Sequence, residues 1–398
     1  MLASTFPPSR AMALDRLAAF VPAAGQLYDA GRNTDPGPDR PGAVSRLSPY
    51  LRHRLITEHE VVAHVLARHN LNAAEKFIQE VLWRTYWKGW LEMRPSVWRR
   101  FGEERDRQRD AFHDDHALTD AERGQTGIEG FDDWARELVD TGYLHNHARM
   151  WFASIWIFTL RLPWTLGADF FLRHLLDADA ASNTLSWRWV AGLQTVGKTY
   201  LATSDNIARY TNGRFAPTGL AREAVALTEA PIEAARDLGG SPRHDPAQPS
   251  ILLVTPEDMH PESAFDGASG FRSVVVASDA DLCWGDGARR FVRSAAAETA
   301  MRAAAYYGCQ SAMMERLDAQ ALIAAANAAG ARRIVTPYAP VGPVADQLAR
   351  LAPLLAREGV TLAQVRRDWD STFWPYAKKG FFAFKERIPV LLRQSGLA

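Results

Sequence analysis

The first half of the chain repeats its apolar residues at helical spacing, with almost no strand pattern between residues 13 and 214. The spacing predicts helices over Leu55–His69, Ala73–Met93 and Tyr143–Leu160. We therefore expect an all-helical domain, which we place at residues 1–237.

The pattern changes after a linker predicted at residues 238–250, where Leu238-Gly239-Gly240-Ser241-Pro242 is followed by more Pro and Ser. Beyond it, short apolar runs at Ile251–Val254, Val274–Ala277 and Arg333–Pro337 are typical of buried strands, and long Ala-rich helical stretches separate them. Strands that alternate with helices predict a doubly wound parallel sheet. The predicted fold class is multi-domain α and α/β, with a Rossmann-like α/β domain at residues 251–398 after the helical one.

Composition narrows the class of protein. The 398 residues are 47% hydrophobic and 23% charged, which is typical of a globular chain. Lys and Arg together number 46, as do Asp and Glu, so any contact with nucleic acid has to come from a local patch. Two cysteines, Cys283 and Cys309, cannot form a disulfide framework or a four-thiolate metal site. So few cysteines indicate a reducing, cytoplasmic location, and we expect no metal. No apolar run reaches transmembrane length and the N-terminus lacks a signal peptide, so we expect no membrane partner. The sequence leaves the oligomeric state open, and a monomer is our expectation.

One motif suggests a nucleotide hydrolase. Residues Gly192–Thr199 fit the phosphate-binding loop pattern letter for letter. That loop requires a buried strand before it and a helix directly after it, so that backbone N–H groups converge on phosphate. The preceding residues, Ser186–Val190, lie in a helical region, so the hydrolase is kept only as a distant alternative.

The tryptophans are more informative, because ten of the 13 fall between Trp83 and Trp189. Helical spacing places Glu80, Trp83, Arg84 and Trp87 on one face. Such a face indicates a polar planar ligand, held by hydrogen bonds and stacking, or else an ion pair packed beside core aromatic residues. Further polar and aromatic groups follow at Asn146, Arg149, Met150, Asp177, Asp179, Asn183, Trp187 and Trp189.

Together these motifs resemble the FAD-binding domain of the photolyase/cryptochrome family, over the segment Tyr28–Arg214. Four ordered motifs across about half of the chain make the resemblance specific. They are Ser45-Arg46-Leu47-Ser48-Pro49-Tyr50-Leu51 with Tyr28 and Arg32 upstream, Glu80-x-x-Trp83-Arg84, His145-Asn146-x-x-Arg149-Met150, and Asp177-x-Asp179 through Asn183 to Trp187-x-Trp189.

The resemblance implies bound FAD. Its diphosphate would lie near Ser45, Leu47 and Ser48, where hydroxyl and backbone N–H groups can donate to it. Arg149 and Asp177 would pair beside the isoalloxazine ring, Asp179 would contact the polar edge of the ring, and the amide of Asn183 would face N5. Tyr28, Arg32, Arg46 and Arg84 complete the implied cofactor-binding set.

The resemblance also implies blue-light-driven repair of DNA that contains pyrimidine dimers. Trp83 and Trp189 would form an aromatic wedge around a flipped-out dimer, lined by Glu80, Asn146 and Met150. Trp187 and Trp164 match two links of the family's electron chain, but the third position falls near residues 111–112, where no Trp exists. The alternative is a cryptochrome-like blue-light receptor without repair activity.

Other features depart from the family. Its members begin with an α/β antenna domain, whereas here residues 321–389 resemble the second half of that domain. We therefore expect a circular permutant, with a generic α/β domain as the alternative and a second, antenna chromophore as an open possibility. Val44, His147 and Ala202 stand where the family has groups that grip phosphate or DNA. Other basic residues are candidates to replace that grip, namely Lys88, Arg94, Arg99, Arg100 and Lys198.

Overall fold

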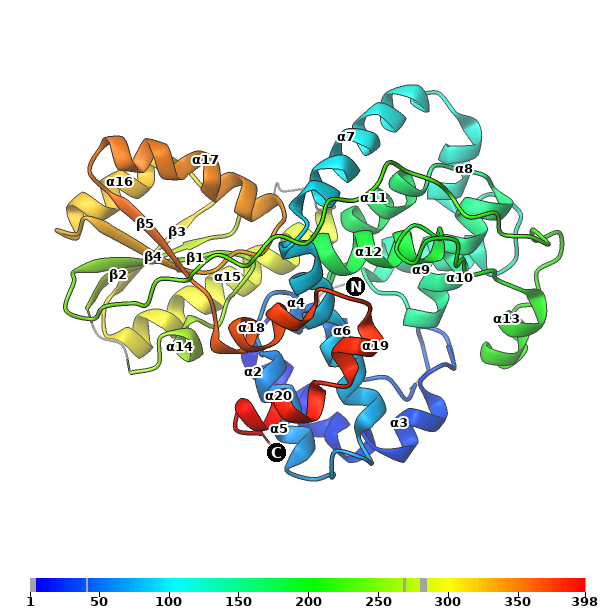
Figure 1. Ribbon diagram of the computed structural model, residues 1–398, viewed down its shortest axis with the longest axis horizontal. Coiled ribbons are helices and arrows are strands. Elements are labelled where there is room, and N and C mark those ends of the chain that lie inside the picture. The colour runs from blue at the N-terminus through cyan, green and yellow to red at the C-terminus, as the bar shows by residue number, and fades with distance from the viewer. Residues whose placement is uncertain (1–4, 41, 268–269, 280–284, 398) are drawn as a thin grey trace.

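The computed structural model describes residues 5–40, 42–267, 270–279 and 285–397, so Cys283 lies outside the described residues. A group of packed helices lies beside a five-stranded sheet that has helices on both faces (Figure 1). We call α2 to α13 the helical body, and β1 to β5 with α14 to α17 the sheet body. The predicted combination of an α and an α/β part is confirmed.

The helical body is built around α6 (Glu75–Glu92), which packs against α5, α7 and α12. The side chains of Thr57 and Glu60 form a capping box at the start of α5, which explains why the helix begins there. The predicted helices are confirmed, except that the third divides into α10 and a wider turn, η2. The other elements are α2 (Arg10–Phe20), η1 (Val21–Ala23), α3 (Gln26–Gly31), α4 (Ser48–Arg52), α5 (Glu58–Leu66), α7 (Pro95–Ala111), α8 (His116–Arg123), α9 (Phe131–Thr141), α10 (Asn146–Ser154), η2 (Ile155–Thr159), α11 (Trp164–His174), α12 (Ala180–Val190) and α13 (Ser204–Tyr210).

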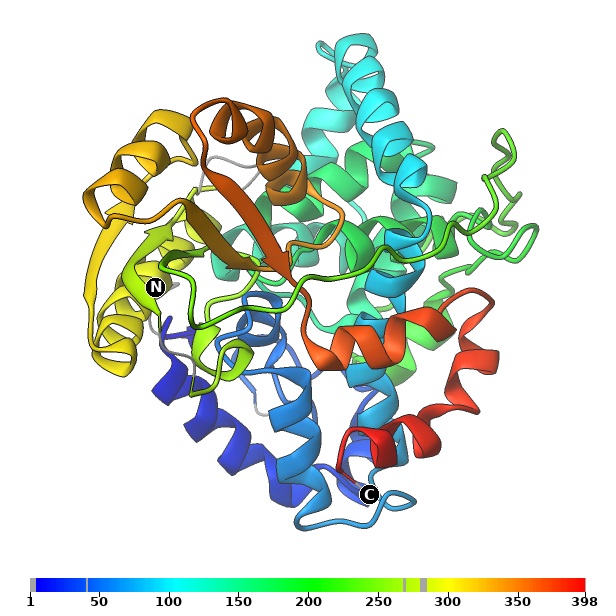
Figure 2. The same ribbon diagram turned by 60° about the vertical axis from the view of Figure 1, so that its left-hand side comes forward.

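The sheet is parallel throughout, in the order β3-β2-β1-β4-β5. On β1, Leu252 and Val254 pack against α15, whereas Ile251 and Leu253 pack against α16 and α17 on the other face (Figure 2). This alternation is what a strand buried on both faces requires. The elements are β1 (Ser250–Val254), α14 (Pro261–Ala264), β2 (Phe271–Ala277), α15 (Asp286–Tyr307), β3 (Gln310–Met314), α16 (Ala319–Ala328), β4 (Arg333–Pro337), α17 (Pro343–Arg357) and β5 (Thr361–Val365).

After β5 the chain returns to the helical body. The helices α18 (Asp368–Phe373), η3 (Trp374–Tyr376), α19 (Phe381–Lys385) and α20 (Ile388–Gln394) follow, and α18, η3 and α19 pack on α6. The indole of Trp369 donates to Thr85 Oγ1 at 3.0 Å, and Tyr86 donates to the carbonyl of Lys379 at 2.8 Å. A Cβ on Gly89 would lie 2.9 Å from Trp374, so α6 needs a glycine where η3 crosses it. Residues 368–385 therefore contact the helical body, although the predicted α/β domain includes them. The predicted domain limits stay a prediction.

Buried ion pairs join the two bodies. Arg52 donates to both oxygens of Glu257 at 2.7 and 2.8 Å, directly beyond β1. Arg54 donates to both oxygens of Asp370 at 2.7 and 2.8 Å, and a second nitrogen of Arg54 lies 3.4 Å from a carboxylate oxygen of Asp258. These side chains are almost fully buried, so the pairs with Glu257 and Asp258 fix the end of α4 against the carboxyl end of β1, and the pair with Asp370 fixes it to α18.

No helix or strand forms from residue 211 to residue 249, a longer irregular stretch than the predicted linker. Within it, residues 217–237, here called the strap, cross the helical body toward β1 (Figure 1). Backbone hydrogen bonds from Leu227 to Ala191 and from Arg236 to Met93 hold the strap in place at 3.0 Å each.

Candidate functional site

A group of buried charges lies where the loop before α4 meets α6, α10 and the start of α12. Arg149 donates two parallel hydrogen bonds to Asp177, at 3.0 and 2.9 Å, and Ser48 also bonds to this carboxylate. Burial alone would raise the pKa of Asp177, but Arg149 outweighs it and the pKa is lowered. Asp177 is therefore a buried carboxylate held in its charged form.

Asp179 fixes the entry to α12. One carboxylate oxygen accepts from the backbone N–H groups of Ala181 and Ser182 at 3.0 and 2.7 Å, and the other pairs with Arg84. Burial opposes ionisation, yet Arg84 and Lys88 lower the pKa of Asp179 below its usual range. The expected pairing of Arg149 with Asp177 is present, and a second pair lies beside it.

Asn183 lies one turn further along α12. Its side-chain NH₂ donates to the carbonyl of Ala168 at 2.8 Å, an orientation assigned from the hydrogen-bond network. The amide is therefore anchored to α11, and its expected contact with flavin N5 stays a prediction.

The loop before α4 carries an unneutralised cation. Arg46 adopts a positive φ of 53° and places its guanidinium 5.2 Å from the centre of the Tyr143 ring. It makes no ion pair within the described part of the chain. Ser45 accepts from the backbone N–H of Leu47 at 3.4 Å. A cation and hydroxyl groups at one loop can hold an anionic group such as phosphate.

His145 adds a donor nearby. Its Nδ1 accepts from the backbone N–H of His147 at 3.2 Å, which leaves the proton on Nε2. Burial lowers the pKa of His145 to about 4, so the ring is neutral near pH 7. Its Nε2 is buried and has no partner within the described residues.

The predicted dimer-binding residues are less closely grouped. Glu80 pairs with Arg32 at 3.0 Å, and burial raises the pKa of its carboxyl although Arg32 opposes the rise. Tyr28 is buried beside the same pair, and burial, with Glu80 next in effect, raises its pKa. Asn146 is exposed and Met150 is half-buried.

The two predicted wedge tryptophans have separate partners. Trp83 stacks on Phe381 of α19, with ring centres 3.5 Å apart and planes 11° apart. Trp189 stacks on Tyr200 at 5.8 Å. Among the described residues no ring contact joins Trp83 to Trp189, so their wedge role stays a prediction. Phe381 is a neighbour that no sequence spacing indicated.

Trp187 is buried, and its indole N–H has no partner among the described groups. Its ring packs against Gly167, one turn along α11 from Trp164. Trp164 in turn lies 5.7 Å from Phe101, which stacks on Trp98 at 5.4 Å. The two expected links of the electron chain thus lie on packed helices.

Several expectations need correction. Lys88 is 3% exposed on α6, so it cannot grip DNA phosphate from there. His147, which departs from the family at its position, stacks on Trp151 at 4.2 Å and bonds to the carbonyl of Asn33 at 2.9 Å. Residues Gly192–Thr199 form a turn after α12 with no strand before it and no helix directly after it, so the nucleotide-hydrolase alternative is wrong.

The described residues contain no group of three or more His, Cys, Asp and Glu side chains able to hold a metal ion. Over the same residues, no helix combines the length and the apolar character that a membrane span needs.

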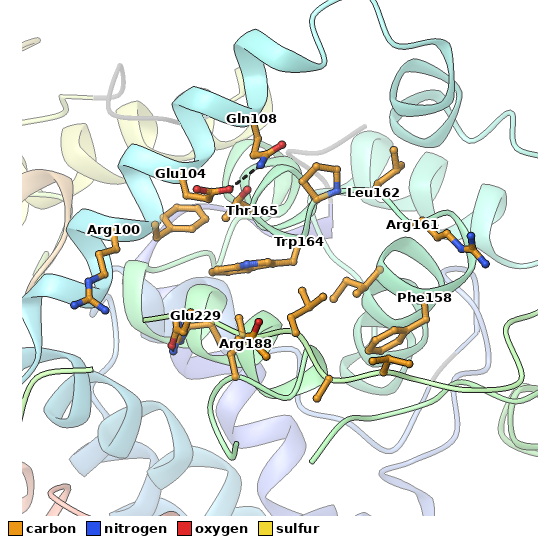
Figure 3. Close-up of a pocket in the computed structure, with 18 of the residues that line it drawn as sticks. Arg100, Glu104, Gln108, Phe158, Arg161, Leu162, Trp164, Thr165, Arg188 and Glu229 are labelled. Carbon is orange, nitrogen blue, oxygen red and sulfur yellow. Dashed lines mark hydrogen bonds and ion pairs between the residues drawn. The ribbon is translucent and has the colours of Figure 1, made fainter. Parts of the chain in front are cut away.

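A half-open cavity of about 1300 Å³ lies elsewhere on the helical body, between α7, the start of α11 and the strap (Figure 3). Trp164 of the predicted electron chain and Arg100 of the predicted basic residues line it. The buried charges around Asp177 are not part of its wall.

Comparison with known proteins gives consistent matches. Residues 77–213 match the family model for the FAD binding domain of DNA photolyase. The deoxyribodipyrimidine photo-lyase of Alkalihalophilus pseudofirmus is 33% identical over 184 residues, which cover 46% of this chain and 38% of the relative. That of Streptomyces griseus is 36% identical over 154 residues, or 38% of this chain and 33% of the relative. The chain thus spans well under half the length of these relatives.

Among solved structures, a bacterial class III photolyase from Agrobacterium tumefaciens matches 53% of this chain and 44% of its own, with 29% identity and a TM-score of 0.45.

Proposed function

Since the helical body of this chain belongs to the DNA photolyase and cryptochrome family, we propose that the protein binds FAD and splits pyrimidine dimers in DNA under blue light. The observation that carries this proposal is the pair of buried carboxylates, Asp177 and Asp179, each held by an arginine of another helix. Ordering two charged pairs in a protein interior is costly, so they favour a ligand site over plain packing.

The residues present fit FAD. Ser45, Ser48 and the unneutralised Arg46 supply donors and a positive charge for the diphosphate, and the unpartnered Nε2 of His145 supplies a further donor. Asp177 and Asp179 are fixed acceptors for the polar groups of the flavin. When bound, FAD supplies one-electron chemistry driven by light, which no side chain of this protein can supply.

The chain's own part in electron supply is assigned to Trp187 and Trp164. Indole is far easier to oxidise than the phenyl rings around it, and Trp187 lies on the same helix face as Asn183. Trp164, at the start of the helix against which Trp187 packs, is the next indole toward the surface.

Dimer recognition is assigned to Glu80, Trp83, Asn146, Met150 and Trp189. Burial raises the pKa of Glu80, which increases the fraction of carboxyl able to donate a hydrogen bond to a dimer carbonyl. The finer expectations also remain predictions, namely a cytoplasmic monomer, a permuted domain order and an antenna chromophore.

The test is the visible spectrum of the purified protein, followed by dimer loss against blue-light dose with pre-reduced protein at low salt. We expect a yellow protein that releases intact FAD on denaturation and repairs dimers in single-stranded DNA. A colourless protein contradicts the proposal, and a yellow one that repairs nothing when reduced supports the receptor alternative.

The variant Glu80→Ala should lower the repair yield without changing the flavin content, because it removes the hydrogen bond to the dimer. Glu103→Ala is a matched control, since Glu103 is exposed on α7. Equal repair by both variants would remove Glu80 from the dimer pocket.

A further inference from the structure

The cavity in Figure 3 has the size and the wall of a nucleotide site. Its volume of about 1300 Å³ exceeds the roughly 300–1,000 Å³ of common small-molecule pockets. The indole of Trp164 lies at its centre, and Phe101, Phe158 and Leu162 extend the apolar wall. Such a wall favours a planar ring that stacks on Trp164.

The wall also contains a hydroxyl group without a partner. Thr165 is 1% exposed, and its Oγ1 makes no hydrogen bond within the described residues. A buried polar group left unpaired is destabilising, so a ligand that bonds to this hydroxyl would remove an existing penalty.

Two cations at the mouth are unneutralised. Arg161 and Arg222 are exposed and make no ion pair or hydrogen bond among the described residues, against one unpaired carboxylate, Glu223. The three other arginines of the wall already have partners: Arg188 binds Glu229 at 2.7 Å, Arg107 pairs with Glu104, and Arg100 donates to the carbonyl of Ala230. The mouth therefore favours an anionic group such as phosphate.

The cavity lies against Trp164, at the point where the predicted electron chain lacks its third tryptophan. At residues 111–112, where a third tryptophan of the chain was expected, the sequence has Ala and Phe. Trp164 instead faces a cavity open to solvent. A small molecule bound there would be in direct contact with Trp164, the outer of the two expected links.

We propose that this cavity binds a reduced nicotinamide nucleotide, whose dihydropyridine ring stacks on Trp164 and returns an electron to it after light-driven oxidation. This inference rests on the proposed function. In the first event the oxidised indole gains one electron from the nucleotide, and the nucleotide radical cation that remains loses one proton to solvent and becomes a neutral radical. The nucleotide radical gives its second electron to Trp164 when it is next oxidised, so one nucleotide serves two events.

Binding is tested in the dark by titrating NADH into the purified protein and following the nucleotide fluorescence. We expect saturable binding, weakened roughly three- to tenfold by Thr165→Val and by Arg222→Glu, as the loss of one hydrogen bond or ion contact predicts. Arg357→Glu makes the same charge change at an exposed position of α17 and should bind NADH as the wild type does. Thr165→Val removes an unpaired hydroxyl, so its melting temperature should not fall.

Electron delivery is tested by the rate of flavin photoreduction against NADH concentration, with half-saturation expected at the dark dissociation constant. Trp164→Phe should keep NADH binding and lose this dependence. The proposed site is wrong if the protein does not bind NADH, or if Thr165→Val and Arg222→Glu both bind NADH with the affinity of the wild type. A photoreduction rate that does not depend on NADH but falls in Trp98→Phe overturns the donor role, because Trp98 would then supply the electron to Trp164 past Phe101. If the purified protein contains no flavin but still binds NADH, the proposed function is wrong and the nucleotide site is retained.

Discussion

At the scale of single residues, the paired arrangement of Arg149 and Asp177 in the interior is what keeps the Asp177 carboxylate charged. The carboxylate is 2% exposed, so its charge depends on the two hydrogen bonds from Arg149. A surface pair of the same chemistry has water as a substitute partner and contributes little.

Arg149→Ala should therefore destabilise the protein by about 3–5 kcal/mol, because it leaves a buried charge without its main partner. It should also lose FAD. Urea unfolding gives the stability, and absorbance gives the flavin content. In Arg99→Ala, the exposed pair with Glu103 is removed instead, and we expect a change under about 1 kcal/mol. Similar costs for the two variants would contradict a buried-charge role for Asp177.

Trp187→Phe should slow or abolish photoreduction and keep the flavin bound, since phenyl keeps the apolar packing but resists oxidation. No hydrogen bond is lost, because the indole N–H is unpartnered within the described residues. Trp134→Phe is a close control: Trp134 is also buried, its N–H has no partner in the described part of the chain, and its ring stacks on Trp151 at 5.3 Å. Photoreduction at wild-type rate in Trp187→Phe would mean that the electron takes another route.

At the scale of elements, α6 shows what periodicity predicts and what it misses. The predicted helix is present, and Glu80, Trp83 and Arg84 lie on it in the expected order. The pattern did not indicate that Lys88 is buried, because the residues that cover it come from segments far away in sequence. The edge strands β3 and β5 were missed for a related reason, since the residues of β3 are mostly exposed, those of β5 are mostly half-buried, and neither strand carries a buried-strand pattern.

Phe381→Ala tests how α19 is held on α6. The side chain is 6% exposed and stacks on Trp83, so its loss should cost about 3–5 kcal/mol of unfolding free energy. Its neighbour Phe382 is 84% exposed, and Phe382→Ala should change stability by less than about 0.5 kcal/mol. Denaturant titration of the two variants makes the comparison; equal stability would mean that α19 does not depend on this stack.

At the scale of the whole molecule, the motifs predicted the fold class and the first buried pair, but not the junction between the bodies. Arg52 and Glu257 are 205 positions apart, and neither belongs to a recognisable local pattern. Long-range pairs of this kind depend on how the two bodies pack, which no helical or strand period encodes.

The junction should make stability depend on pH. Burial, aided by Arg52, lowers the pKa of His53 to about 3, and its Nδ1 lies 2.7 Å from the carbonyl of Pro256. Between pH 6.5 and 3 the unfolded chain binds a proton there and the folded chain does not. The unfolding free energy should then fall as pH falls, by up to about 1.4 kcal/mol per pH unit from this group.

His53→Gln should remove that part of the slope between pH 6 and pH 4, measured by urea titration at each pH. His116→Gln changes an exposed residue of α8 and should leave the slope as in the wild type. A slope unaffected by His53→Gln would assign the acid sensitivity to other groups.

The contact of α18 to α19 with α6 also has a consequence for biosynthesis. Tyr86 and its partner Lys379 are 293 positions apart, so at about 5–20 residues per second the ribosome needs roughly 15–60 s to make the second after the first. During that time the aromatic face of α6, with Trp83 and Tyr86, has no cover from α19 in the nascent chain. Chaperones that bind exposed apolar helices should therefore engage this protein until translation passes residue 385.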